Sequence, residues 1–117
     1  MNFSQPFFTI LIICGTVFLI LGWILRNKPP KSINYYFGYR TSSAMKSKDR
    51  WDFAQSYSGK LLTNSGGALV VFAIISLFFE IPETAGNIIG TVLTVLVIFI
   101  IIFKVERALR NNFNQEG

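Results

Sequence analysis

The chain has 117 residues, of which 51% are hydrophobic and 15% are charged. Soluble domains carry roughly 25% charged residues, so this composition is typical of a protein that resides in lipid. One cysteine and no histidine exclude an intrachain disulfide and a cysteine-rich zinc site. We therefore expect one integral membrane domain, residues 1–117, with no metal and no cofactor.

Three long apolar runs follow one another along the chain. Residues 6–25 hold no charge, residues 61–81 carry only Glu80 near their end, and residues 86–103 are the most apolar. At about 1.5 Å per residue, a run of this length reaches about 30 Å, the thickness of the hydrocarbon core. Because lipid offers the backbone no hydrogen bonds, each run should be helical. The sequence predicts an all-α membrane protein with three transmembrane helices.

The first run differs from a cleaved signal peptide. Residues 1–5 contain no Lys or Arg, and no A-x-A site follows the run. Its apolar stretch also exceeds the roughly 7–15 residues of a signal-peptide core. We expect it to be a retained anchor.

Basic residues are distributed unevenly between the runs. Eight of the 11 lie in the loop at residues 26–60 and three in the tail after residue 103, whereas residues 1–5 and 82–85 have none. The positive-inside rule therefore places the loop and the C-terminus in the cytoplasm, and the N-terminus and the short turn outside. Since the net charge of +5 flanks apolar runs, direct nucleic-acid binding is not expected.

Six glycines recur at helical spacing, in pairs seven or four residues apart: Gly15 and Gly22, Gly59 and Gly66, Gly86 and Gly90. Each pair marks one helix face. Small residues let membrane helices approach closely, either within one chain or between the chains of a homo-oligomer. The alternative is that glycine is simply common in membrane helices.

The first half of the loop contains an aromatic cluster at residues 35–39. Such rings favour the membrane interface, so this segment is expected to lie against the bilayer. Gly38 permits a turn that a side chain would block. Arg40 and Thr41 follow at once. We expect Thr41 to brace the turn and Arg40 to bind a carboxylate or phosphate.

The end of the loop is predicted to form an interfacial helix that runs into the second span. Ser47 is its expected N-cap, and Asp49 and Asp52 suit the positive end of the helix dipole. Trp51 is expected to lock this helix against the bilayer or the first span. In the simplest interpretation the helix only lies on lipid, with Lys48 and Arg50 on lipid phosphates, and Arg40 contacts a headgroup, Asp49 or Asp52.

The order and spacing of the loop residues resemble the signature of the SdpI family of bacterial membrane proteins. The residues that carry the resemblance are Asn34, Gly38, Tyr39, Arg40, Thr41, Ser47, Trp51, Ala54, Gly59 and Lys60. The resemblance covers residues 34–103, with Gln55 where the family usually has asparagine. Longer members carry a further N-terminal membrane block, so the chain is similar to the short, single-unit members.

This resemblance implies a multi-pass protein of the bacterial cytoplasmic membrane that confers immunity to a secreted peptide toxin, the sporulation-delaying protein. The protein would bind the toxin or shield its target, and Glu80 and Glu83 in the outer turn would attract a basic ligand. The candidate binding residues are Asn34, Gly38, Arg40, Thr41, Ser47, Trp51 and Gln55.

The same sequence also bears on four other functions. In one alternative the loop recruits a soluble cytoplasmic regulator for signal transduction, and in another the chain is an accessory subunit of a membrane complex. Catalysis is not expected, because there is no histidine base and Cys14 lies within an apolar run. Coupled transport is poorly supported, because the middle of each run lacks an ionisable residue.

Overall fold

The computed structural model describes residues 3–33 and 38–113. Within these ranges the regular structure is helical, with the order α1 (Pro6–Asn27), a 3₁₀ turn η1 (Ala44–Lys46), α2 (Lys48–Ser76) and α3 (Glu83–Phe113). The helices α1, α2 and α3 are each long and apolar enough to cross a membrane. The predicted all-α membrane architecture is therefore confirmed, and the chain is a multi-pass membrane protein.

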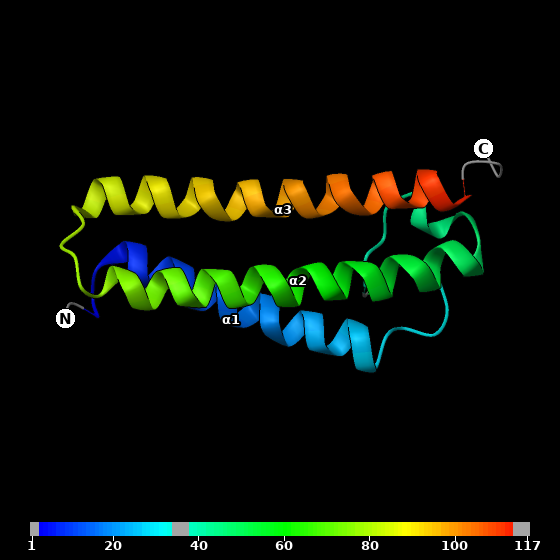
Figure 1. The fold of residues 1–117 in the computed structure, drawn as a ribbon, viewed down its shortest axis with the longest axis horizontal. Coiled ribbons are helices and arrows are strands. Elements are labelled where there is room, and N and C mark those ends of the chain that lie inside the picture. Colours follow the sequence, from blue (N-terminus) through cyan, green and yellow to red (C-terminus); the bar gives the residue numbers. More distant parts are fainter. Residues whose placement is uncertain (1–2, 34–37, 114–117) are drawn as a thin grey trace.

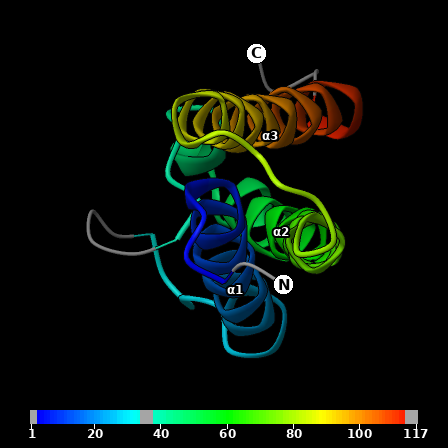
Figure 2. The ribbon, with the colours of Figure 1, turned by 90° about the vertical axis from the view of Figure 1, so that its left-hand side faces the viewer.

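The three long helices form an elongated bundle of 51 × 24 × 21 Å. In Figure 1 α2 and α3 run side by side along the long axis, and α1 crosses α2 obliquely. Viewed along the axis in Figure 2, the helices occupy the corners of a triangle. We call the end that carries residues 28–33 and 38–47 the loop end, and the end that carries residues 77–82 the turn end.

Glycines allow the backbones of α1 and α2 to come into direct contact. A Cβ built on Gly66 would lie 2.8 Å from both the carbonyl oxygen of Gly15 and the amide nitrogen of Leu19. About two turns further toward the loop end, a Cβ on Gly22 would lie 2.8 Å from the carbonyl oxygen of Gly59. Backbones can approach this closely only where neither helix carries a side chain at the crossing.

The glycine pair of α3 faces α1. A Cβ on Gly86 would lie 3.2 Å from Phe7, and a Cβ on Gly90 would lie 3.4 Å from Ile10. All six predicted packing glycines thus face another helix of the same chain.

The predicted interfacial helix is the first part of α2. The Ser47 Oγ accepts a hydrogen bond of 3.1 Å from the amide of Arg50, which confirms Ser47 as the N-cap. From Lys48 the helix continues without a break to Ser76. The residues before position 61 are therefore an extension of the second span, and their placement along the bilayer surface stays a prediction.

The expectation that the second apolar run is helical as far as Ile81 is wrong, because α2 ends at Ser76. The amides of the next three residues, 77–79, bond to carbonyls three residues back at 3.1 Å, which tightens the chain into 3₁₀ geometry. Pro82 then disfavours helical geometry at Ile81.

The third helix is longer than its apolar run. It begins at Glu83 and continues ten residues beyond Phe103, to Phe113. In that extension Val105 and Leu109 are fully buried in a cluster with Ala54 of α2. This packing keeps the charged tail helical, because burial of apolar side chains stabilises the added turns.

A side chain at the turn end ties the N-terminus to the α2–α3 connection. Gln5, which is 4% exposed, donates from Nε2 to the carbonyl oxygen of Ser76 at 2.8 Å. Its Oε1 accepts from the amide of Ile81 at 3.1 Å. Gln5 therefore adds a second donor to the Ser76 carbonyl, which also accepts from the Phe79 amide, and supplies the acceptor for the Ile81 amide in the connection.

Candidate functional site

One buried side chain fastens the loop to α2. Gln55 is fully buried, and its Oε1 accepts from the amide of Tyr39 while its Nε2 donates to the carbonyl oxygen of the same residue, both at 2.7 Å. The side-chain amide thus pairs with both polar groups of Tyr39, much as a neighbouring β-strand would. We call this pairing the Gln55 clamp.

The glycine before Tyr39 makes the clamp possible. Gly38 has φ +106°, in the region that disfavours residues with a Cβ, which confirms the predicted glycine turn. A Cβ at this position would also lie 2.5 Å from the Gln55 Oε1. Both backbone conformation and space therefore require glycine.

A carboxylate on α3 binds the same part of the loop. The Tyr39 hydroxyl donates to the Glu106 Oε2 at 2.7 Å, and the Thr41 Oγ1 donates to the same oxygen at 2.8 Å. The Thr41 Oγ1 also accepts from the amide of Ala44 at 3.2 Å, where η1 begins. Thr41 thus braces the turn, and the loop bridges α2 and α3. Sequence reasoning missed Glu106, because its partners lie 65 and 67 residues away.

Arg50 joins the loop to the last turn of α3. Its side chain is 3% exposed and donates to the Ser43 carbonyl oxygen at 2.7 Å, the Ser43 Oγ at 2.6 Å and the Phe113 carbonyl oxygen at 3.1 Å. Its guanidinium carbon also lies 5.6 Å from the centre of the Phe113 ring. The interpretation that Arg50 contacts lipid phosphates is therefore wrong, because the fold buries this cation.

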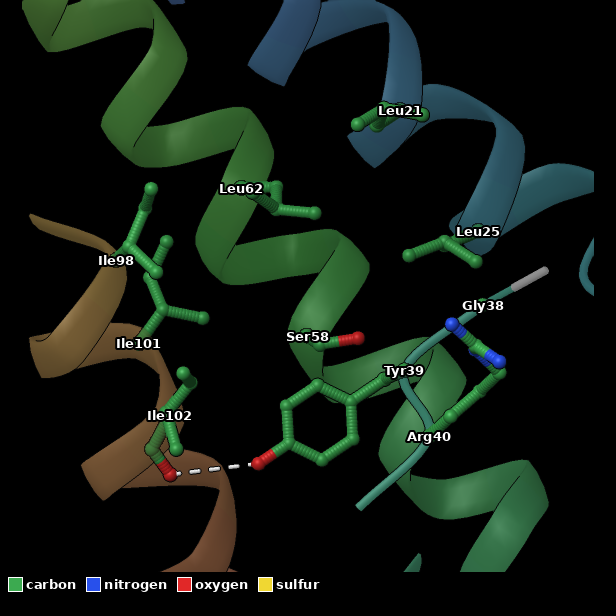
Figure 3. A pocket seen from close by; sticks show the side chains of 10 residues that line it. All are labelled: Leu21, Leu25, Gly38, Tyr39, Arg40, Ser58, Leu62, Ile98, Ile101 and Ile102. Carbon is green, nitrogen blue, oxygen red and sulfur yellow. Dashed lines mark hydrogen bonds between the residues drawn. The ribbon is translucent and has the colours of Figure 1, made fainter. Parts of the chain in front are cut away.

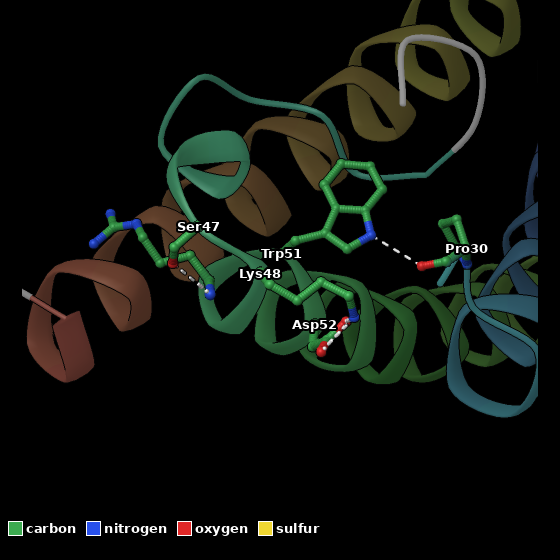
Figure 4. Close-up of polar contacts among 6 residues, drawn as sticks. Pro30, Ser47, Lys48, Trp51 and Asp52 are labelled. Atoms are coloured by element: carbon green, nitrogen blue, oxygen red, sulfur yellow. Dashed lines mark hydrogen bonds and ion pairs between the residues drawn. The ribbon is translucent and has the colours of Figure 1, made fainter. Parts of the chain in front are cut away.

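Trp51 locks α2 to the segment that leaves α1. Its side chain is fully buried, and its Nε1 donates to the carbonyl oxygen of Pro30 at 2.9 Å (Figure 4). The ring therefore packs inside the protein, and the alternative of a bilayer contact is wrong. On the exposed side of the same helix, Lys48 pairs with Asp52 at 2.6 Å, a surface ion pair that contributes little to stability.

The candidate residues that the structure describes lie in the loop before α2, at the N-cap of α2 or in its first eight residues: Gly38, Arg40, Thr41, Ser47, Trp51 and Gln55. Gly38, Thr41, Trp51 and Gln55 hold the loop in place, and Ser47 caps the helix beneath it. Arg40 is exposed and faces a cavity. Asn34 lies outside the described residues.

A cavity of about 320 Å³ opens between the three helices beneath the loop (Figure 3). Its walls are apolar and come from all three helices: Leu21, Leu25, Leu62, Ile98, Ile101 and Ile102. The loop supplies Gly38, Tyr39 and Arg40, and α2 adds Ser58. In Figure 3 the Tyr39 ring points toward α3, whereas the Arg40 side chain extends toward α1.

The phenol of Tyr39 is held in its neutral form. Burial, and then the hydrogen bond to Glu106 and the negative charge of that carboxylate, raise the pKa of Tyr39 well above its ordinary value of 10.0. Because the folded-state pKa exceeds the unfolded one, the contribution of Tyr39 to stability is complete below about pH 10 and is lost as the pH rises through the folded-state value.

We therefore expect Tyr39 to ionise only at a pH where the loop detaches. In a titration followed by tyrosinate absorbance, Tyr39→Phe should remove the last-titrating component and leave the earlier ones in place. An unchanged late component in this variant would show that Tyr39 titrates like an exposed phenol.

Comparison with known proteins gives two matches. The model of the SdpI/YfhL protein family matches residues 31–105. The "uncharacterized protein YfhL" of Bacillus subtilis (strain 168) is 38% identical over 55 residues, which are 47% of this chain and 50% of that relative. The matched segment thus spans half the length of the relative. No solved structure matches. Because the family match covers more than half of the chain, including the glycine turn, all of α2 and most of α3, this chain belongs to the SdpI/YfhL family.

Proposed function

We propose that this protein protects its cell against a secreted antimicrobial peptide, by binding the toxin or shielding its membrane target. The observation that carries the proposal is the family match over residues 31–105, which contains both partners of the Gln55 clamp, Tyr39 and Gln55. The family resemblance implies immunity to a secreted peptide, and the chain offers a polar face at each end of a membrane bundle where such a peptide would be sensed.

In this proposal the turn end faces outside and meets the toxin. Glu80 and Glu83 are both exposed there, and Glu80 lines a hollow with Gln5 and Pro82. Two carboxylates without a neighbouring Lys or Arg in residues 77–85 favour a basic peptide. The loop end then faces the cytoplasm, in accord with its basic residues.

A second candidate function is recruitment of a soluble regulator to the loop end. It is favoured by the extension of α2 and α3 beyond their apolar runs, where buried Arg50 and Trp51 fix the loop as a structured cap. A cap of this kind presents a defined surface, including the exposed Arg40, to a protein in the cytoplasm.

The test is survival of a toxin-sensitive bacterial strain that expresses this chain and is challenged with the sporulation-delaying toxin. We expect the unaltered chain to protect, Arg40→Ala to reduce protection to the level of the empty vector, and Lys28→Ala, an exposed basic residue outside the family match, to protect fully. Membrane fractionation establishes that each variant is inserted. Absence of protection by an inserted, unaltered chain would contradict immunity to this toxin.

Substitutions at the two ends of the bundle distinguish toxin immunity from recruitment of a regulator. The double change Glu80→Gln and Glu83→Gln should abolish protection while leaving co-purification of a cytoplasmic partner intact. If the double variant still protects and only Arg40→Ala fails, the outer carboxylates take no part and recruitment by the loop becomes the better account.

A further inference from the structure

We propose that the cavity at the loop end binds an anionic phospholipid from the adjacent leaflet, with one acyl chain among the helices and the phosphate on Arg40. The inference is independent of toxin immunity, because it concerns a resident ligand of the bundle and is measured without any toxin.

The size and lining of the cavity suit an acyl chain. Its volume of about 320 Å³ lies within the range of ligand pockets, roughly 300–1,000 Å³. Leucine and isoleucine side chains from all three helices form the walls, so water inside would find few polar partners. Apolar cavities of roughly half this size stay dry and accept apolar ligands.

The polar groups of the cavity gather on one side. Tyr39 and Arg40 both come from the loop that covers the cavity, and the opposite walls are apolar (Figure 3). The ligand must therefore be an amphiphile, with its polar group at the loop and its apolar part between the helices.

The positive charge of Arg40 determines which polar group of a ligand the cavity favours. Arg40 is the single charged residue among the ten that line the cavity, and it is exposed. The nearby carboxylate of Glu106 accepts hydrogen bonds from Tyr39 and Thr41 and does not line the cavity. A guanidinium binds a phosphate through paired N–H donors, so the site favours a phosphate-bearing anion.

The depth of the cavity also matches a lipid. The uncharged runs end at Leu25 in α1 and Phe103 in α3, and basic residues follow each of them directly. Leu25 and Ile102 both line the cavity, which therefore sits at the boundary between the apolar runs and the basic loop end. Phosphate groups of a bilayer lie at this boundary, with their acyl chains directed toward the apolar side.

The experiment is lipid titration of the full chain, released from detergent micelles and weighed by native mass spectrometry. The probes are phosphatidylglycerol and phosphatidylcholine with identical acyl chains. The unaltered chain should retain one phosphatidylglycerol several-fold more tightly than phosphatidylcholine. Equal retention of the two lipids by the unaltered chain would overturn the proposal without the need for any variant.

Variants locate the retained lipid. Arg40→Gln should weaken phosphatidylglycerol retention about tenfold, since it removes charged hydrogen bonds to the phosphate. Lys60→Gln, which changes an exposed basic residue outside the cavity, should have no effect on it. Ile98→Trp should fill the cavity from a 41% exposed position and abolish retention of both lipids, whereas Ile100→Trp, two residues along the same helix and outside the cavity, should not.

Three outcomes would overturn the assignment. Retention that survives Ile98→Trp would place the lipid on another surface, and equal losses in Arg40→Gln and Lys60→Gln would indicate general attraction to positive charge. Displacement of the lipid by inorganic phosphate alone would indicate a headgroup site with no acyl chain in the cavity.

Discussion

Gly66→Ala is expected to destabilise the bundle, whereas the same change at the next residue, Gly67→Ala, is expected to leave it unchanged or more stable. The new methyl group at Gly66 would lie 2.8 Å from backbone atoms of both Gly15 and Leu19. Neither atom can move without shifting α1, because both belong to its main chain. Overpacking of this kind costs about 1–3 kcal/mol of the free energy of unfolding, and occasionally more.

Gly67 provides the matched control. It lies in the same helix, and a Cβ there would meet nothing within 4 Å. Alanine at this position gains the intrinsic helix preference over glycine, up to about 1 kcal/mol. The measurement is the melting temperature of each purified variant in one detergent. The two substitutions should shift it in opposite directions, and a fall of similar size in both would show that the cost comes from the loss of glycine and not from the helix crossing.

Gln55→Leu is expected to release the loop while leaving the three-helix bundle folded. Leucine has a similar volume but no hydrogen-bonding group, so both the amide and the carbonyl group of Tyr39 lose their partners. A backbone group that loses its partner in a water-poor site costs about 1–3 kcal/mol, so the closed loop is destabilised relative to an open loop in which water satisfies both groups. The result should be an open loop.

Cleavage by trypsin after Arg40 reports that opening directly. Each 1.4 kcal/mol of lost stability raises the population of the open loop about tenfold, so Gln55→Leu should accelerate cleavage by about ten- to a hundredfold. Ser56→Ala, at the exposed neighbouring position, should leave the rate unchanged. An unchanged rate in Gln55→Leu, with intact helicity by circular dichroism, would show that the clamp does not hold the loop closed.

The spans were predictable because their causes are local. Uncharged runs of bilayer length must form helices in lipid wherever they occur. The N-cap at Ser47 and the turn at Gly38 were likewise predictable, because each depends only on the residue itself and its nearest neighbours. The end of α2 at Ser76 was not predicted, because Leu77 to Phe79 remain as apolar as the span itself. There the apolar run exceeds the helix, and the geometry of the connection before Pro82 sets the boundary.

The site was predictable only in part, because its partners are distant in sequence. The loop pattern pointed to Gln55 and Trp51, but nothing nearby indicated that Gln55 binds the Tyr39 backbone or that Trp51 donates to Pro30. Glu106 and Gln5 were missed because each is one polar residue whose role exists only after the helices pack. Arg50 was misread for the same reason, since an arginine near an apolar run normally contacts lipid, and only the fold buries it against Phe113.

The uninterrupted course of α2 has a mechanical consequence. Its 29 residues form a rod of about 43 Å with no proline between Lys48 and Ser76 at which it would bend. Gln5 donates a hydrogen bond to Ser76, the last residue of α2, and Gln55, near the start of the same helix, holds the loop through Tyr39. A tilt imposed at the turn end is therefore expected to reach the loop end as a displacement of Gln55 against Tyr39.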